Sequence, residues 1–328
     1  MSKYNEKKMV DEIRLLALDM INNAKSGHPG IVLSAAPMLY TLFANHMVFD
    51  LNNPNWCNRD RFVLSAGHGS ALLYAVLYAT TEDFTIEELK KFRKINSTTP
   101  GHPELNIKKR IEATTGALGQ GFATSVGMAI AEKYLEEKYN TKKLTLFNYN
   151  IYCLCGDGDL MEGVASEAAS FAGTQNLDKL IVLYDHNNIS LDGKTDLTFK
   201  EDVAERFEAY GFEIFEVKNG ESVKAISSAI KEAKKIKRPA LIIIDTIIGR
   251  GSINENSHTV HGKPLDKDDI VKLRESFKMK TGSFEIDVEA KENFRNQIIY
   301  FFNIFRTKVV YATFSLNKFN HNTTTFIF

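Results

Sequence analysis

Two oxygen-bearing side chains, those of Asp157 and Asn187, stand where short apolar runs of the sequence end. The runs cover residues 151–155 and 179–184 and have the pattern of buried strands, so each polar residue follows a strand. In open parallel sheets, ligands bind in the crevice beyond the carboxyl ends of the strands. Carboxylate and amide oxygens suit Mg²⁺ or Ca²⁺, and a metal with few protein ligands usually shares a di- or triphosphate. The spacing therefore predicts a site for a metal ion and a diphosphate.

Glycines flank the carboxylate, since Gly156 and Gly158 stand on either side of Asp157. Without a Cβ, the backbone there can bring its N–H groups close to a phosphate. Residues 160–175 have helical potential, so the turn also leads into a helix N-terminus, where anions are favoured. The alternative is that Asp157 only caps a helix and Asn187 only shapes a turn, as both residue types often do. Their matching positions at two strand ends favour the metal site.

Five of the eight histidines lie in loops, or beside helix starts, in segments that contain glycine, proline or serine: His28, His68, His102, His258 and His261. A single loop histidine is usually a solvated surface residue. Several histidines beside one cleft could instead donate hydrogen bonds to polyol hydroxyls and move protons near neutral pH. The remaining three, His46, His186 and His321, belong to no strong motif.

Apolar periodicity predicts the elements that must position these residues. Near-continuous apolar runs predict strands at residues 61–65, 151–155, 179–184, 213–217 and 240–246. Helical spacing predicts helices at residues 9–22, 31–45, 71–78, 85–92, 116–137, 160–175, 200–210 and 222–236. At Thr85, the glutamate three residues on has the spacing of a capping box. Buried strands that alternate with amphipathic helices predict an α/β fold with a parallel sheet and helices on both faces.

The composition limits the classes of partner. Lysine and arginine number 41 and aspartate and glutamate number 41, so bulk charge indicates neither nucleic acid nor an anionic membrane. Three cysteines without a CxxC motif disfavour a zinc or redox site. The first twelve residues are polar, with neither a signal core nor a transit pattern. We therefore expect a cytoplasmic location.

The last part of the chain differs in kind. Residues 298–328 are rich in Phe, Asn and Thr, without a helical or strand period. The apolar run at 298–302 is much shorter than the ~20 residues that a membrane-spanning helix needs. We interpret this tail as atypical, and as a non-native or truncated gene end.

Further motifs narrow the interpretation. GDG followed about thirty residues later by NN resembles the thiamine diphosphate motif. Five further motifs follow one another along the chain: SGHPG at 26–30, GHGS at 67–70, PGHPE at 100–104, TTGALGQG at 114–121 and HTVHG at 258–262. Their order is that of a single protein family. Together they resemble the N-terminal, diphosphate-binding domain of transketolases, over roughly Leu15 to Leu273. The resemblance implies a thiamine diphosphate-binding fold at residues 1–277, followed by a linker-like segment at 278–297.

The resemblance also implies a cofactor site. The metal, Mg²⁺ or Ca²⁺, would be held by Asp157, Asn187 and the carbonyl of Ile189. Residues expected to contact thiamine diphosphate are His68, Gly116, Leu118, Gly156, Gly158, Asn187, Leu191, Ile248 and His261. For Leu191 and Ile248, ordinary core packing would look the same in sequence.

By the same resemblance, several residues would serve the reaction. His28 and His261 would bind hydroxyls of the donor ketose, His102 would hold the two-carbon fragment, and His258 would line the substrate channel. Glu162 would belong to a hydrogen-bonded link between two active sites across a dimer, although an acidic residue is favoured in a first helical turn in any case. The residues expected to be catalytic are therefore His28, His102, His261 and Glu162.

The implied activity is transfer of a two-carbon ketol unit from a ketose phosphate to an aldose phosphate, as in the pentose phosphate pathway. Substrates would be xylulose 5-phosphate, ribose 5-phosphate and erythrose 4-phosphate. In the family, a neighbouring subunit's second domain supplies the glutamate that activates the cofactor. We therefore expect a homodimer, or pairing with a pyrimidine-binding domain, and little activity from this chain alone.

Three alternatives stay open. The chain could be the N-terminal subunit of a split transketolase, or a non-catalytic fragment that binds the cofactor or dimerises. Dihydroxyacetone synthase shares most of these motifs. Enzymes that make a deoxyketose phosphate fit less well, because the motifs GHPG and PGHPE resemble transketolase sequences more closely.

Overall fold

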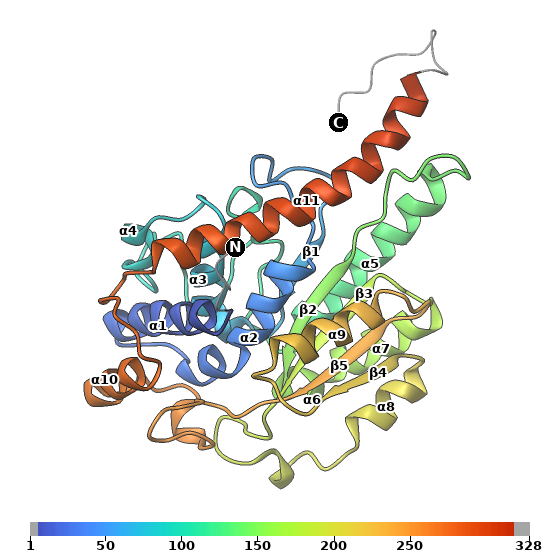
Figure 1. Ribbon diagram of the computed structural model, residues 1–328. Coiled ribbons are helices and arrows are strands. Elements are labelled where there is room, and N and C mark those ends of the chain that lie inside the picture. The colour runs from blue at the N-terminus through green and yellow to red at the C-terminus, as the bar shows by residue number, and fades with distance from the viewer. Residues whose placement is uncertain (1–5, 318–328) are drawn as a thin grey trace.

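A parallel sheet forms the centre of the protein (Figure 1). The computed structural model describes residues 6–317, and their side chains as far as residue 305. Within this part of the chain, the sheet has five strands in the order β1-β2-β3-β5-β4, and each strand is parallel to its neighbours. The strands are β1 (Arg61–Leu64), β2 (Ile151–Gly156), β3 (Leu180–His186), β4 (Glu213–Val217) and β5 (Ala240–Asp245). The predicted strands and their parallel arrangement are confirmed.

Both faces of the sheet are covered by helices, as the apolar strands predict. On one face α2 (Pro29–Asn45) and α9 (Val223–Ala233) contact the strands, and α1 (Glu6–Ala24) and α3 (Ser70–Thr80) pack on α2. The other face is covered by α5 (Gln120–Tyr139), α7 (Gly163–Thr174) and α8 (Val203–Tyr210). Successive residues of β2 enter opposite cores: Tyr152 and Leu154 one, Cys153 and Cys155 the other.

Several helix ends differ from the sequence prediction. The capping box at Thr85 is present, but α4 (Ile86–Leu89) ends sooner than the predicted helix. The helix expected at 160–175 is divided into α6 (Asp157–Met161) and α7, because Glu162 has extended backbone angles. An additional helix, α10, covers Lys267–Ser276. Short 3₁₀ turns occur at η1 (Gly67–Gly69), η2 (Ile107–Lys109), η3 (Thr195–Leu197) and η4 (His258–Val260).

The first part of the tail, from residue 298, belongs to a helix, α11 (Val288–Asn317), although no helical period was apparent there in the sequence. Ala290, Phe294 and Ile298 recur every four residues and are buried in the core that contains α2 and α3. The Phe294 ring lies 4.9 Å from that of Tyr40. This inward stripe is narrow, and exposed apolar residues beside it, such as Tyr300, obscured its period. Residues 318–328, including His321, lie outside the described residues, and the domain division stays a prediction.

None of the helices within the described residues combines the length and the hydropathy needed to cross a bilayer.

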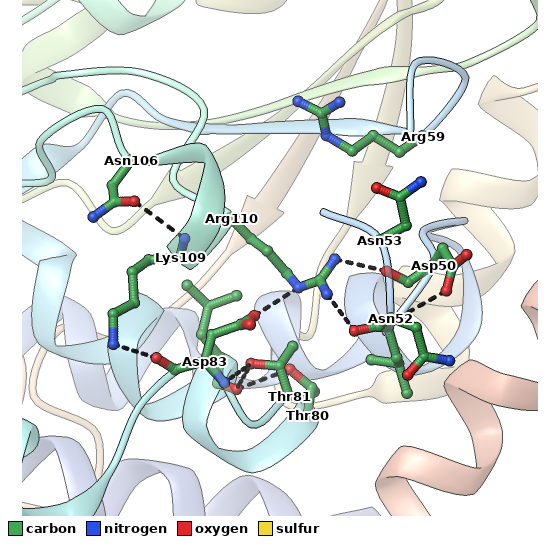
Figure 2. Close-up of polar contacts among 12 residues, drawn as sticks. Asp50, Asn52, Asn53, Arg59, Thr80, Thr81, Asp83, Asn106, Lys109 and Arg110 are labelled. Atoms are coloured by element: carbon green, nitrogen blue, oxygen red, sulfur yellow. Dashed lines mark hydrogen bonds and ion pairs between the residues drawn. The ribbon is translucent and has the colours of Figure 1, made fainter. Parts of the chain in front are cut away.

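A polar network anchors the long loop between α4 and α5, which carries His102 and Gly116 (Figure 2). The guanidinium of Arg110 donates to Asp83 Oδ2 at 2.7 Å and to the carbonyl oxygens of Asp50 and Leu51 at 2.9 and 2.6 Å. These contacts tie the loop to the segment after α3 and to the segment before β1. The loop that carries His102 is therefore anchored at Arg110.

Gly173 sets how closely α7 approaches the end of α8. A Cβ at Gly173 would lie 1.6 Å from the carbonyl oxygen of Tyr210, so any side chain forces the backbone apart. We predict that Gly173→Ala lowers the free energy of unfolding by about 3 kcal/mol. Gly127→Ala is the matched control, because no atom lies within 4 Å of its Cβ position and alanine favours the helix. Chemical denaturation measures both, and equal stability of the two variants would contradict the prediction.

Candidate active site

A cavity of about 510 Å³ lies at the carboxyl ends of β2 and β3. The register of the two strands places Gly156 beside Asp185, so their following residues leave the sheet together. Most of the predicted site residues line this cavity: His28, His68, Gly116, Leu118, Gly156, Asp157, Gly158, Glu162, Asn187, Ile189, Leu191, Ile248 and His261. His102 lies just behind His28, and His258 is exposed on η4 outside the lining.

Asp157 and Asn187 lie together, as their positions at strand ends predict. Asp157 Oδ2 accepts a hydrogen bond from the backbone N–H of Asn187 at 3.3 Å, and Asp157 Oδ1 accepts one from the Tyr184 hydroxyl at 2.7 Å. Asp157 is 4 % exposed, and burial raises the pKa of its carboxyl. In the described part of the chain, no lysine or arginine forms an ion pair with it. A buried carboxylate of this kind fits a bound divalent cation.

A second buried carboxylate, Asp185, supports this pair, and the sequence did not single it out. Its oxygens accept hydrogen bonds from Ser34 Oγ at 2.9 Å, from the Thr246 hydroxyl and from Asn187 Nδ2 at 3.3 Å. Because the amide nitrogen of Asn187 donates to Asp185, its oxygen is turned to the other side, where it accepts a hydrogen bond from the N–H of Ile189 at 3.1 Å. Burial raises the pKa of Asp185 to about 6. The strand-end argument that selected Asn187 could have found it, because Asp185 is two residues earlier.

Asp159 joins three segments of the site, and it too was not predicted. It accepts hydrogen bonds from the N–H of Gly156 at 3.0 Å, from the N–H of Gly119 at 2.9 Å and from Ser65 Oγ at 2.7 Å. These donors belong to the turn after β2, to the start of α5 and to the end of β1. A single carboxylate thus fixes the glycine turn relative to its neighbours.

The glycines leave room where a ligand would approach. A Cβ at Gly156 would meet no atom within 4 Å, although Gly156 lines the cavity. At Gly116 the backbone is in the left-handed region, with φ of 139°, and a Cβ would lie 3.0 Å from the His102 ring. Only glycine therefore allows His102 and this turn to lie so close together.

Four histidines from four separate segments form a cluster, and three of them, His28, His68 and His261, line the cavity. The rings of His68 and His261 are stacked with centroids 5.2 Å apart, and His28 lies 5.2 Å from His68 and 5.7 Å from His261. The His102 ring is 6.4 Å from that of His28. Burial lowers the pKa of each ring, that of His28 to about 4, and neighbouring positive charge adds to this for all but His261. Near pH 7 the cluster is therefore neutral and available for hydrogen bonding.

Comparison with known proteins identifies the family. Residues 5–302 match the family model described as transketolase, thiamine diphosphate binding domain. The chain belongs to the transketolase family. A probable transketolase of Streptococcus pneumoniae is 49 % identical over 291 residues, covering 88 % of this chain and 44 % of that protein. The Geobacillus stearothermophilus transketolase is 50 % identical over 275 residues, covering 83 % of this chain and 41 % of that protein.

Solved transketolases share the fold. The enzyme from Leishmania mexicana matches with a TM-score of 0.90 and 40 % identity, over 94 % of this chain and 46 % of that chain. A Pichia stipitis transketolase in complex with sedoheptulose 7-phosphate matches with a TM-score of 0.90 and 40 % identity, over 95 % and 46 %. The chain thus spans less than half the length of these transketolases. The predicted family and fold are confirmed, while the roles of the individual site residues stay predictions.

Two apolar residues of the cavity lining are exposed to solvent. Leu118 is 40 % exposed and Leu191 is 63 % exposed, although both line the cavity. Ile248, in contrast, is 2 % exposed and belongs to the core. Glu162 is exposed at the N-terminal end of α7, and its expected role stays a prediction.

The neutral histidines predict a pH dependence of stability. The unfolded chain protonates His28 near pH 6.5, but the folded chain resists protonation until about pH 4. Between these values the unfolded state binds more protons, so the free energy of unfolding falls as the pH is lowered. His28→Gln should reduce this loss between pH 6.5 and 4, measured by denaturation at each pH. The exposed His258→Gln is the control, and an unchanged pH slope in His28→Gln would contradict the prediction.

Proposed function

We propose that this chain forms the diphosphate-binding part of a transketolase active site. The complete site would transfer a two-carbon ketol unit from a ketose phosphate to an aldose phosphate in the pentose phosphate pathway. The observation that supports this best is the convergence of Asp157, Asn187 and three neutral histidines at one cavity beyond two parallel strands, with His102 beside them.

The cofactor would be thiamine diphosphate with Mg²⁺ or Ca²⁺. Asp157, the amide oxygen of Asn187 and the carbonyl oxygen of Ile189 would hold the metal. The backbones of Gly156 and Gly158, with His68 and His261, would contact the diphosphate. Gly116, Leu118, Leu191 and Ile248 would surround the rings. When bound, thiamine diphosphate supplies a nucleophilic carbon and a sink for electrons, while the protein supplies orientation.

The histidines would bind the sugar. A neutral imidazole has one N–H donor and one acceptor nitrogen, which match hydroxyl groups. His28 and His261 would contact the donor hydroxyls near the bond that breaks, His102 the two-carbon fragment, and His258 the channel. Complexes of the Pichia stipitis enzyme with sedoheptulose 7-phosphate and fructose 6-phosphate support sugar phosphates as the substrate class. We propose xylulose 5-phosphate, ribose 5-phosphate and erythrose 4-phosphate as substrates.

A partner would complete the site. The exposed Leu118 and Leu191 leave an apolar part of the cavity wall uncovered. On α5 and α7, Ile130, Tyr134 and Phe171 are 41 %, 57 % and 48 % exposed. We propose that these surfaces meet a second copy or a pyrimidine-binding domain, that Glu162 takes part in the contact, and that the protein acts in the cytoplasm.

We predict little two-carbon transfer by the chain alone and measurable transfer after a transketolase C-terminal part is added. The assay uses xylulose 5-phosphate and ribose 5-phosphate with thiamine diphosphate and Mg²⁺. Cofactor binding is measured in parallel by calorimetry. Full activity of the isolated chain would refute the need for a partner. If the chain binds the cofactor but shows no transfer with C-terminal parts from several transketolases, the non-catalytic alternative would be favoured.

Asp157→Asn should weaken binding of thiamine diphosphate with Mg²⁺ at least 100-fold, because it removes the only carboxylate among the proposed metal ligands. The measurement is calorimetric titration of the chain with the cofactor at fixed Mg²⁺. Glu208→Gln is the matched control, since it makes the same chemical change at an exposed position of α8. Unchanged cofactor binding in Asp157→Asn would contradict the proposal that Asp157 holds the metal.

A further inference from the structure

Arg93 lies behind the histidine cluster in an unusual backbone conformation. It follows α4 with φ of 60°, a left-handed value that is uncommon for a residue other than glycine. Its N–H donates to the carbonyl of Thr99 at 3.0 Å, which closes the turn. Such conformations persist where surrounding contacts fix them, and they cluster at functional sites. No sequence motif had singled out this residue.

The guanidinium of Arg93 is directed at the segment that begins α2. Nη1 donates to Ser26 Oγ at 2.9 Å, and Nη2 lies 3.3 Å from His28 Nδ1. A Cβ at Gly101 would lie 2.9 Å from Nε of Arg93, so glycine is needed there to admit the guanidinium. Its position beside His28 is thus fixed from two sides.

This contact determines which ring nitrogen of His28 carries the proton. A guanidinium has N–H donors and no acceptor. Nδ1 of His28 must therefore accept with its lone pair, and it cannot be protonated while the contact lasts. In a neutral imidazole the proton is then on Nε2.

The opposite nitrogen of the ring is available to a ligand. Among the described residues, no hydrogen bond to His28 Nε2 is formed. The atom lies near Gly262, whose Cβ position is 3.7 Å away, and His28 lines the cavity beside the rings of His68 and His261. His28 can thus present an N–H, rather than a lone pair, to a molecule bound there.

We propose that Arg93 is a positioning residue that holds His28 as its neutral Nε2–H tautomer, so that His28 donates a hydrogen bond to an oxygen of the bound sugar phosphate and does not act as a base toward it. The identity of the ligand rests on the proposed function, whereas the tautomer does not.

The tautomer is measurable on the 328-residue chain without any cofactor. Long-range ¹H–¹⁵N correlation of ¹⁵N-histidine protein distinguishes protonated from unprotonated ring nitrogens, and His28→Gln assigns the signals. We expect a protonated Nε2 and an unprotonated Nδ1 in the native chain at pH 7. In Arg93→Met the two tautomers should mix, and Arg93→Lys, which retains a donor, should restore part of the preference. A protonated Nδ1 in the native chain, or identical spectra in all variants, would overturn the proposal.

Lys91→Met removes a cation from an exposed neighbouring position and should leave the His28 signals unchanged. If Arg93→Met does not fold, the native chain and Arg93→Lys still decide the tautomer.

With a complementing C-terminal part, Arg93→Met should lower kcat/KM for the ketose about 10- to 100-fold, mainly through loss of one hydrogen bond to the sugar. Lys91→Met should stay within about twofold. A native chain that shows the expected spectrum but stays inactive with the complementing part would count against the proposed function alone.

Discussion

The pairing of β2 with β3 is the contact on which the candidate site depends. Because Gly156 lies beside Asp185, the two chains leave the sheet at the same level, and Asp157 and Asn187 come within hydrogen-bonding distance. A shift of register by one residue would turn the side chains of β3 to the opposite face of the sheet. Apolar residues fill both faces of these strands, so such a shift would exchange the side chains that fill the two cores. The packing of the core thereby fixes the geometry of the polar edge.

The other side chains of the site come from segments that are distant in sequence, and buried polar contacts hold these segments together. Asp159 joins the ends of β1 and β2 to the start of α5, and Arg110 anchors the loop that carries His102. Removing one member of such a network leaves buried partners unpaired, which costs more than the lost bond. These contacts therefore help to hold the histidines close together, although they come from separate segments of the chain.

Much of this arrangement was predictable from the sequence because its signals are local. The strands are near-continuous apolar runs, the glycine turn follows β2 directly, and the order of the motifs indicated the family. Other features depend on contacts between distant segments. Asp159 and Arg93 act through partners up to about ninety residues away, and no periodicity reveals such partners. The helix α11 was missed because its buried stripe is only one residue wide in each turn. Exposed apolar residues around the stripe removed the contrast between apolar and polar positions on which a helical pattern depends.

The position of α11 also affects the order in which the molecule can assemble. Phe294 and Ile298 complete the core that α2 and α3 begin, so these helices pack against residues that come much later in the sequence. During synthesis, this part of the core stays unfinished until α11 has emerged from the ribosome. Contacts between such distant segments are slow to form, because the entropy of closing a long loop is lost before the contact is made. The helices α1, α2 and α3 therefore need protection from aggregation until α11 has been synthesised.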